Sequence, residues 1–368
     1  MQFCSRGRIN WWMGVVVSAS LLGACGSPDE HAGEVLVEAE TVRDAVAGDV
    51  TVTLSVPRQS LAASEGVSVT VTLTNVTQGT VRLLKRDTPV EGLKSDLFSV
   101  SVDGAAVEYQ GRYYKWGPPQ PSDYLSLAGG ESVSYTVDLA ATYDFARTGN
   151  YSLRYGAGVQ DSTEGQADVS QLSSESLSVF VEGRPFVDPG AEEVGSVSAM
   201  ALTTANCNAT RTTQATRAFN DAKTMANGSV SWLNNPPSPY TRFKTWFGPY
   251  NATTRNQIRT HFNTIKGAFD TKPVIIDCGC TDNVYAYVYK SRPYRIYVCN
   301  LFWSAPPTGT DSKAGTLIHE MSHFTAVADT DDWAYGQNAC RGLANSNPGR
   351  ARDNADSHEY FAENTPRQ

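Results

Sequence analysis

A change in the spacing of apolar residues divides this chain into two parts with different folds. Between Asp49 and Gly183, apolar residues recur at every second position in short runs rich in Val, Thr, Ser and Tyr, and Gly, Asn and Asp separate these runs. Such alternation is typical of strands with one buried face, and a series of short strands indicates an all-β sandwich. The runs are DVTVTLSV, GVSVTVTLTN, DLFSVSVDG, GESVSYTVDL, GNYSLRYGAG and ESLSVFVEG. We therefore predict an immunoglobulin-like sandwich over residues 48–183.

The C-terminal part has helical spacing instead. TRTTQATRAFNDAKTMANGSVSWL and TTRNQIRTHFNTIKGAF carry apolar residues three or four positions apart, and the chain from Asp311 onward has mostly helical patterns. Short strand patterns lie between them, namely KPVIID, VYAYVY and YRIYVC. We predict an α+β domain over residues 204–368 that is mainly helical with a small sheet. Residues 184–203 contain Pro, Gly and acids without periodicity, which indicates a linker.

The N-terminus carries an export signal. Arg6 and Arg8 precede an apolar run from Trp11 to Leu22, which is too short for a comfortable membrane span. The following LLGAC resembles the lipobox of bacterial lipoproteins, which implies removal of residues 1–24, lipidation of Cys25 and a tether over residues 25–47. The alternative is an ordinary secretory signal that is cut nearby. Either way we expect an exported protein, lipid-anchored at a bacterial cell envelope or secreted after processing, whose only membrane contact is the anchor.

The charge of the chain argues against a nucleic-acid partner, because the net charge is -8. This charge is unevenly distributed. Residues 1–200 carry 13 Lys and Arg against 25 Asp and Glu, whereas residues 201–368 carry 17 against 13. Opposite net charges are consistent with contact between the two parts, and equally with compositional drift between unrelated domains.

The stretch HEMSH contains the zinc-protease pattern H-E-x-x-H. On a helix, His319 and His323 lie on one face and can bind the same ion, while Glu320 can take a proton from a water molecule. A catalytic zinc usually takes a third protein ligand. The candidates are the acids and the histidine downstream, and the pattern leaves them open: Asp329, Asp331, Asp332, His358 and Glu359.

The longer stretch HEMSHFTAVADTDDWAYGQ resembles the aspzincin metalloproteases, the deuterolysin family. This resemblance implies a zincin-type domain in which Asp332 is the third zinc ligand and Tyr335 stabilises the transition state. Asp329 stands where the family usually has glycine, and Asp331 becomes a solvated neighbour of the ligand. The alternative role for Tyr335 is that of a core aromatic residue.

Other segments resemble the peptidyl-Lys metalloendopeptidases across nearly all of residues 205–368: YTRFKTWFG, AYVY, VCNLFW, TGTDSKAGTLIHEMSHFT and NADSHEYFAEN. The resemblance implies that Asp356 and Glu359 form the S1′ pocket, which binds the lysine that follows the cleaved bond. The i, i+3 spacing puts both carboxylates on one helix face, where they can accept an ammonium group. The alternative is a solvated helix face, and His358 between them is expected to point elsewhere.

The cysteines of the C-terminal part are expected to be structural in an oxidising compartment. C-x-C at Cys278 and Cys280 is also compatible with a metal or redox site, but structural bridges are favoured. The peptidyl-Lys resemblance implies the pairs Cys207–Cys278 and Cys280–Cys299. Cys340 has no counterpart in that group and is expected to be a buried, inert thiol.

These expectations combine into a zinc metalloendopeptidase that cleaves Xaa-Lys bonds in lysine-containing proteins or peptides. One Zn²⁺ per chain is held by His319, His323 and Asp332, with Glu320 as general base. Family members carry a β-rich propeptide that residues 48–183 resemble more loosely, so this part is expected to act as an inhibitor or folding aid for a monomeric enzyme. The competing idea is a retained adhesion-like module that holds the enzyme near the membrane or a substrate. The alternatives are a deuterolysin-like protease of broad specificity and an inactive metal-binding surface lipoprotein.

The positions of the lysines bear on how such an enzyme matures. No lysine occurs between Lys115 and Lys223. A strictly lysine-directed protease therefore cannot cut its own linker. We expect that another protease cuts it, or that this enzyme cuts it with relaxed specificity.

Overall fold

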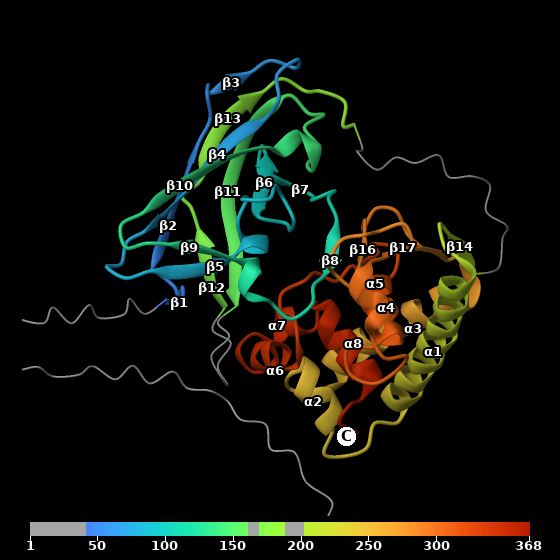
Figure 1. The fold of residues 1–368 in the computed structure, drawn as a ribbon. Coiled ribbons are helices and arrows are strands. Elements are labelled where there is room, and N and C mark those ends of the chain that lie inside the picture. Colours follow the sequence, from blue (N-terminus) through green and yellow to red (C-terminus); the bar gives the residue numbers. More distant parts are fainter. Residues whose placement is uncertain (1–41, 161–168, 188–201) are drawn as a thin grey trace, which may run out of the picture. The chain divides into compact units, whose positions relative to one another are not determined.

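A computed structural model of the chain describes residues 42–160, 169–187 and 202–368 (Figure 1). The predicted signal peptide, the lipidation site Cys25 and most of the tether and linker lie outside these residues. Among the helices of the described ranges, none has the length and apolar character needed to cross a membrane.

The N-terminal part is rich in β-structure, as the alternating runs predict, and all six runs form strands. Its strands form three sheets with the orders β1-β5-β9, β10-β4-β2 and β3-β13-β11-β6-β7, and β12 pairs with β11. The immunoglobulin-like arrangement stays a prediction. The elements are β1 (Arg43–Asp44), β2 (Val50–Ser55), β3 (Ser60–Leu61), β4 (Ser68–Asn75), β5 (Val81–Leu84), η1 (Lys85–Asp87), β6 (Phe98–Val102), β7 (Ala105–Val107), η2 (Pro121–Asp123), β9 (Tyr124–Leu127), β10 (Ser132–Asp138), η3 (Leu139–Ala141), β11 (Gly149–Gln160), β12 (Val169–Ser173) and β13 (Leu177–Val181).

Strand β4 illustrates why the alternation produces these sheets. Val69, Val71 and Leu73 are fully buried on one face, where they join the hydrophobic core. The threonines between them face the other side, and the Thr72 hydroxyl lies 2.7 Å from that of Ser134 on the neighbouring β10. Each face of the strand therefore has partners suited to its chemistry.

The C-terminal part is an α+β region, as predicted. Its helices surround a small mixed sheet in which β14, β15 and β17 are parallel and β16 is antiparallel. The elements are β14 (Thr203–Ala205), α1 (Ala209–Asn234), α2 (Thr241–Phe247), α3 (Ala252–Thr271), β15 (Ile275–Asp277), β16 (Ala286–Val288), β17 (Arg295–Val298), α4 (Asn300–Ser304), α5 (Lys313–His323), α6 (Gln337–Ser346), α7 (Pro348–Ala351) and α8 (Ala355–Glu363).

Helices α5 and α8 pack closely, and every residue of both is buried. The hydroxyl of Ser312 caps α5 by accepting a hydrogen bond from the Gly315 N–H at 2.9 Å. Glu363 at the end of α8 accepts hydrogen bonds from the Ser312 N–H and hydroxyl, at 2.8 and 2.7 Å. A Cβ atom on Gly315 would lie 2.1 Å from Glu363 Oε1, so only glycine permits this approach. The contact fixes the two helices that carry most of the candidate site residues.

One strand of the N-terminal part joins the sheet of the C-terminal part. Strand β8 (Tyr113–Lys115) pairs antiparallel with β16 and completes the order β14-β15-β17-β16-β8 (Figure 1). In this register Lys115 lies opposite Ala286, Tyr114 opposite Tyr287 and Tyr113 opposite Val288. No sequence pattern predicted this pairing, because a three-residue strand is too short to show alternation.

The cysteines form the pairs that the resemblance implied. Cys207 is bonded to Cys278 and Cys280 to Cys299, and Cys340 is a buried free thiol. The C-x-C segment is therefore a pair of structural bridges. The first bond joins the segment before α1 to the end of β15, and the second links the loop after β15 to the end of β17.

Candidate active site

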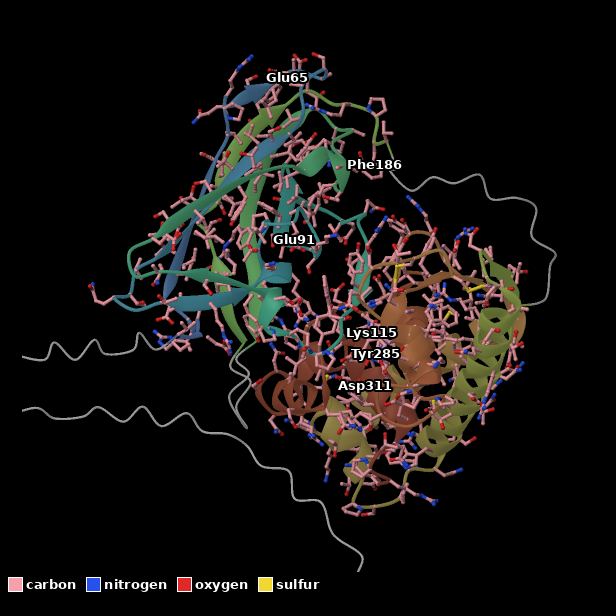
Figure 2. All side chains as sticks on the ribbon, viewed as in Figure 1. Glu65, Glu91, Lys115, Phe186, Tyr285 and Asp311 are labelled. Carbon is pink, nitrogen blue, oxygen red and sulfur yellow. A yellow bond between two sulfur atoms is a disulfide. The ribbon has the colours of Figure 1, made fainter. Side chains whose placement is uncertain are left out.

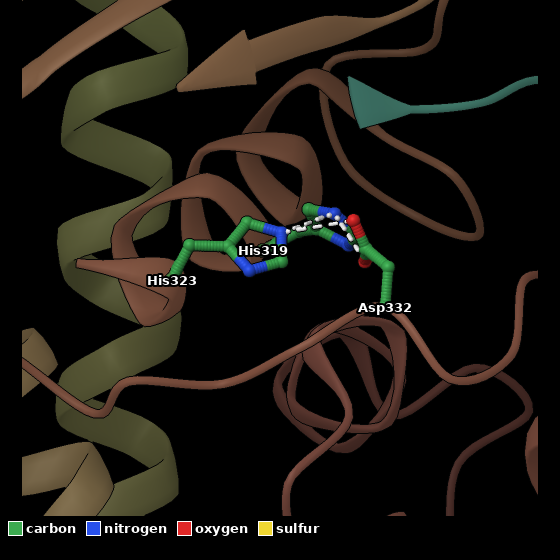
Figure 3. A group of neighbouring side chains, drawn as sticks. All are labelled: His319, His323 and Asp332. Carbon is green, nitrogen blue, oxygen red and sulfur yellow. Dashed lines mark hydrogen bonds and ion pairs between the residues drawn. The ribbon is translucent and has the colours of Figure 1, made fainter. Parts of the chain in front are cut away.

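Helix α5 brings the two histidines of H-E-x-x-H together. The Nε2 atoms of His319 and His323 lie 3.1 Å apart, and both side chains are fully buried (Figure 3). The other ring nitrogens face acceptors, since His323 Nδ1 lies 2.8 Å from the Thr330 carbonyl oxygen and His319 Nδ1 lies 2.7 Å from Asp356 Oδ1. Protons on the Nδ1 atoms satisfy these contacts, which leaves the lone pairs of both Nε2 atoms pointing toward one position.

Asp332 completes this cluster. Its Oδ1 lies 3.3 Å from His319 Nε2 and its Oδ2 lies 3.3 Å from His323 Nε2. Both oxygens are buried and accept no hydrogen bond within the described part of the chain. Burial alone would raise the pKa of Asp332, but His323 and His319 hold it below its usual value.

The cluster fits a metal ion. Lone pairs of two imidazoles and one carboxylate converge on one position, and a cation there would relieve their repulsion. Two ligands each about 2.0–2.2 Å from a tetrahedral zinc ion are roughly 3.3 Å apart, close to the observed separations. The three residues are one of the groups in the described chain able to hold an ion.

The loop that carries Asp332 is held by Asn354, which sequence reasoning missed. Asn354 Oδ1 accepts hydrogen bonds from the N–H groups of Trp333 and Ala334, both at 2.9 Å, and its Nδ2 donates to the Ala334 carbonyl at 3.1 Å. The side chain is fully buried. Its only signal in the sequence is an asparagine just before α8, which reads as a helix cap.

Asn354→Ala is expected to weaken metal binding about 10–100-fold, because the alanine leaves the backbone groups beside Asp332 without partners. The loss of the hydrogen bonds made by the Asn354 side chain is also expected to reduce the free energy of unfolding by about 1–3 kcal/mol. Competitive zinc titration and chemical denaturation measure the two effects. Asn338→Ala, at an exposed position, is the control and should change neither. Unaltered zinc affinity in Asn354→Ala would remove this residue from the account.

The other candidates for the third ligand lie outside the cluster. Asp331 was expected to be solvated rather than bound to the ion, and its part-exposed carboxylate pairs with Lys290. His358 points away from the site, as expected. Its Nδ1 lies 2.9 Å from the Asn354 carbonyl oxygen, and its Nε2 lies 2.9 Å from His261 Nδ1. Burial lowers the pKa of His358 to about 3 and that of His261 to about 4, so both rings are neutral near pH 7.

Tyr335 contacts the peptide bond between Tyr114 and Lys115, and Glu320 is influenced by the charge of Lys115. The Tyr335 hydroxyl donates a hydrogen bond to the Tyr114 carbonyl oxygen at 3.0 Å. Glu320 is fully buried, and this burial raises its pKa well above the ordinary value. Asp332 adds to that rise, while the Lys115 side chain and backbone N–H oppose it. The predicted catalytic tyrosine therefore contacts this bond of β8 directly, and the charge of Lys115 acts on Glu320.

Asp356 and Glu359 lie side by side on α8 and hold the ammonium group of Lys115. The Lys115 Nζ lies 2.6 Å from Glu359 Oε2 and 3.2 Å from Asp356 Oδ1. Both acids are almost fully buried, which excludes the alternative of a solvated helix face. The Gly336 N–H donates to Asp356 Oδ2 at 2.7 Å, so the same acid contacts the turn after Tyr335.

The pocket contains groups that were not predicted (Figure 2). Asp311 Oδ1 lies 3.8 Å from the Lys115 Nζ, and the ring centre of Tyr285 lies 5.2 Å from it. Burial acts to lower the pKa of Lys115, but Asp356 and Glu359 raise it well above its usual range. Lys115 and Asp311 come from segments without a recognisable local signal, and only the tertiary fold brings them to α8.

Comparisons with known proteins agree with this geometry. The family described as "Lysine-specific metallo-endopeptidase" matches residues 233–363. An extracellular protease of Aeromonas hydrophila is 40% identical over 311 residues, which cover 83% of this chain and 90% of the relative. A peptidyl-Lys metalloendopeptidase of Armillaria mellea is 33% identical over 335 residues, covering 83% and 89%. A peptidyl-Lys metalloendopeptidase of Pleurotus ostreatus is 47% identical over 161 residues, covering 44% and 95%.

Proposed function

Because this chain belongs to the aspzincin (M35) family of zinc metalloendopeptidases, we propose that it cleaves peptide bonds on the N-terminal side of lysine. The observation that carries the proposal is the position of Lys115 in the candidate active site. Its ammonium lies on Asp356 and Glu359, while the carbonyl of the peptide bond before it accepts a hydrogen bond from Tyr335. Two of the relatives are named as peptidyl-Lys enzymes, which supports the same specificity.

The charge of the pocket supports a preference for lysine. Asp356 and Glu359 are buried, so an apolar side chain in this position would leave them without a partner, at a large cost in binding free energy. Lysine suits the site because its ammonium is a compact charge on a long apolar stem. The rings of Tyr285 and Tyr360, at 5.2 and 5.9 Å from the Lys115 Nζ, add aromatic faces that attract a cation.

The same geometry supports a set of catalytic roles. We assign His319, His323 and Asp332 as ligands of one zinc ion, which supplies Lewis-acid activation of a water molecule and of the scissile carbonyl. Glu320 takes the proton from the water and delivers it to the leaving amine, whose position corresponds to the Lys115 nitrogen. The Tyr335 hydroxyl, which lies on the carbonyl oxygen, stabilises the negative charge that develops there.

The remaining assignments follow from the sequence. We propose that residues 48–183, an immunoglobulin-like sandwich, are a prosegment that inhibits or helps to fold the protease domain at residues 204–368. A signal over residues 1–24 exports the chain, and Cys25 is its lipid anchor.

A digest of a peptide library, with and without a chelator, tests the proposed specificity. Because Lys115 occupies the pocket, the Lys115→Ala variant is digested beside the wild type. Chelator-sensitive cuts confined to bonds before lysine are the expected result. Cuts scattered over many residues would indicate the broad deuterolysin-like protease instead, and no cleavage by either protein would indicate an inactive metal-binding lipoprotein.

Glu359→Gln is expected to lower the preference for lysine over norleucine at P1′ on the order of 100-fold, because it removes one carboxylate from the ammonium. The quantity to measure is kcat/KM for two peptides that differ only at P1′, in the Lys115→Ala background. Asp221→Asn, at a half-buried position of α1 where the carboxylate pairs with Arg217, is the control. A Glu359→Gln variant that retains the full preference would refute this role.

A further inference from the structure

We propose that residues 113–116 act as a built-in substrate mimic that keeps the intact chain latent, with Lys115 in the P1′ position. The inference rests on the proposed lysine specificity and concerns the regulation of the same lysine-binding site. Its basis is the position of β8, a strand of the N-terminal part that lies in the candidate active site of the C-terminal part.

The backbone of β8 is bound as an added strand. It pairs antiparallel with β16, and the Tyr285 N–H donates a hydrogen bond to the Lys115 carbonyl oxygen at 2.9 Å. Adding a strand to a sheet edge is a general way of binding an extended peptide, because main-chain hydrogen bonds supply affinity whatever the sequence. An external peptide needs the same edge of β16, so β8 and a substrate exclude each other.

The side chain of Lys115 supplies the specific contact. It is 1% exposed and lies within 4 Å of carboxylate oxygens of Glu359, Asp356 and Asp311. A single buried lysine among three acids gives this segment the chemistry that the pocket selects in a substrate. A substrate lysine therefore has to replace Lys115 before it can reach Asp356 and Glu359.

The register of the strand is that of a substrate. The Tyr114 carbonyl accepts from the Tyr335 hydroxyl at 3.0 Å, and the next residue places its ammonium on Glu359 and Asp356. One residue earlier, the Tyr113 ring centre lies 5.2 Å from that of the candidate ligand His323. A slip of one residue would turn Lys115 away from α8, since successive side chains of a strand point to opposite faces.

Contacts on both sides hold the segment in place. Arg112 donates hydrogen bonds to the hydroxyls of Tyr114 and Tyr289, at 3.1 and 3.0 Å. The Arg86 guanidinium lies 5.7 Å from the Trp116 ring centre and 4.8 Å from that of Tyr335. Because both flanks are continuous with the folded N-terminal part, β8 is present at a high effective concentration beside the site. It would stay there even after hydrolysis of the Tyr114–Lys115 bond.

Peptide binding to the full-length, zinc-loaded chain tests the proposal without turnover. Two proteins are compared, Glu320→Gln and Glu320→Gln with Lys115→Ala. The probe is a fluorescein-labelled Tyr-Tyr-Lys-Trp-Gly peptide, with a second probe in which norleucine replaces lysine. Removing Lys115 is expected to tighten binding of the lysine probe at least tenfold, since the apparent affinity is the intrinsic affinity multiplied by the fraction of open sites.

The outcomes separate this proposal from the proposed function. A lysine probe that binds selectively but equally well to both proteins would overturn the inhibition by β8 and leave the lysine pocket standing. Equal binding of both probes to the double variant would overturn the lysine pocket and with it this inference. Selective and tighter binding supports both.

Two further variants control for folding and for unspecific charge effects. Lys115→Met keeps the length of the side chain without its charge, and should reproduce the effect if Lys115→Ala unfolds in thermal denaturation. Lys85→Ala removes a lysine that pairs with the exposed Glu91 and should leave probe binding unchanged. Tightening by Lys85→Ala to the same degree would contradict the specific role of Lys115.

Discussion

Glu320→Gln is expected to reduce kcat for a lysine peptide by about 1,000-fold and to leave zinc content unchanged. Glutamine keeps the volume of the side chain but takes up no proton from water and delivers none to the leaving amine. Glu320 is fully buried on α5 next to the candidate ligand His319, and its pKa is influenced by both Asp332 and Lys115.

The comparison is made in the Lys115→Ala background so that the substrate site is open in both proteins. Single-turnover kinetics measure the chemical step, and atomic emission measures bound zinc. Glu175→Gln, an exposed position in the N-terminal part, is the matched control and should retain full activity. A Glu320→Gln enzyme within tenfold of its parent would show that another group is the general base.

Asp332→Ala is expected to weaken zinc binding on the order of 1,000-fold and to lower peptide hydrolysis to background. Structural zinc sites bind with about 10–16 kcal/mol shared among about four ligands, so one ligand accounts for roughly 3–4 kcal/mol. The loss also leaves two imidazoles 3.1 Å apart without the carboxylate that faces both of them.

Zinc affinity by competition with a chelating dye measures this loss directly. The matched control is Asp331→Ala, one residue earlier, whose side chain pairs with Lys290 outside the cluster. This variant should bind zinc as the parent does. Loss of zinc from Asp331→Ala, together with its retention by Asp332→Ala, would reverse the assignment of the two acids.

Local patterns in the sequence predict much of the fold and part of the site. His319, Glu320 and His323 follow from helical spacing, since residues four apart share a face. The strands of the N-terminal part and the long helices α1 and α3 follow from their periodicity. The choice of Asp332 among the neighbouring acids came from the family resemblance, because residues 324–336 form no regular element whose geometry the sequence could fix.

Contacts between distant residues were beyond sequence reasoning. Lys115 and Asp356 are 241 positions apart, and neither stands in a pattern that points to the other. Asn354 was missed because its buried hydrogen bonds run to Trp333 and Ala334, on a loop 20 residues earlier. Only the folded chain brings such partners together.

The net charges of the two parts also give the wrong sign for the charges that meet at the candidate site. The excess of acids in residues 1–200 would place negative charge of the N-terminal part against positive charge of the C-terminal part. At the candidate site the opposite holds, because the N-terminal part supplies the cation of Lys115 to the acids of α8. Net charge describes an average over a surface, whereas the contact depends on single buried groups.

The most direct test of the account is an anomalous-scattering map at the zinc edge from crystals of the zinc-loaded, full-length Glu320→Gln chain. We expect one peak about 2.0–2.2 Å from His319 Nε2, His323 Nε2 and a carboxylate oxygen of Asp332. In the electron-density map from the same crystals, the Lys115 ammonium should lie against Asp356 and Glu359. A peak elsewhere, or an Asp332 side chain turned away from the ion, would contradict the account.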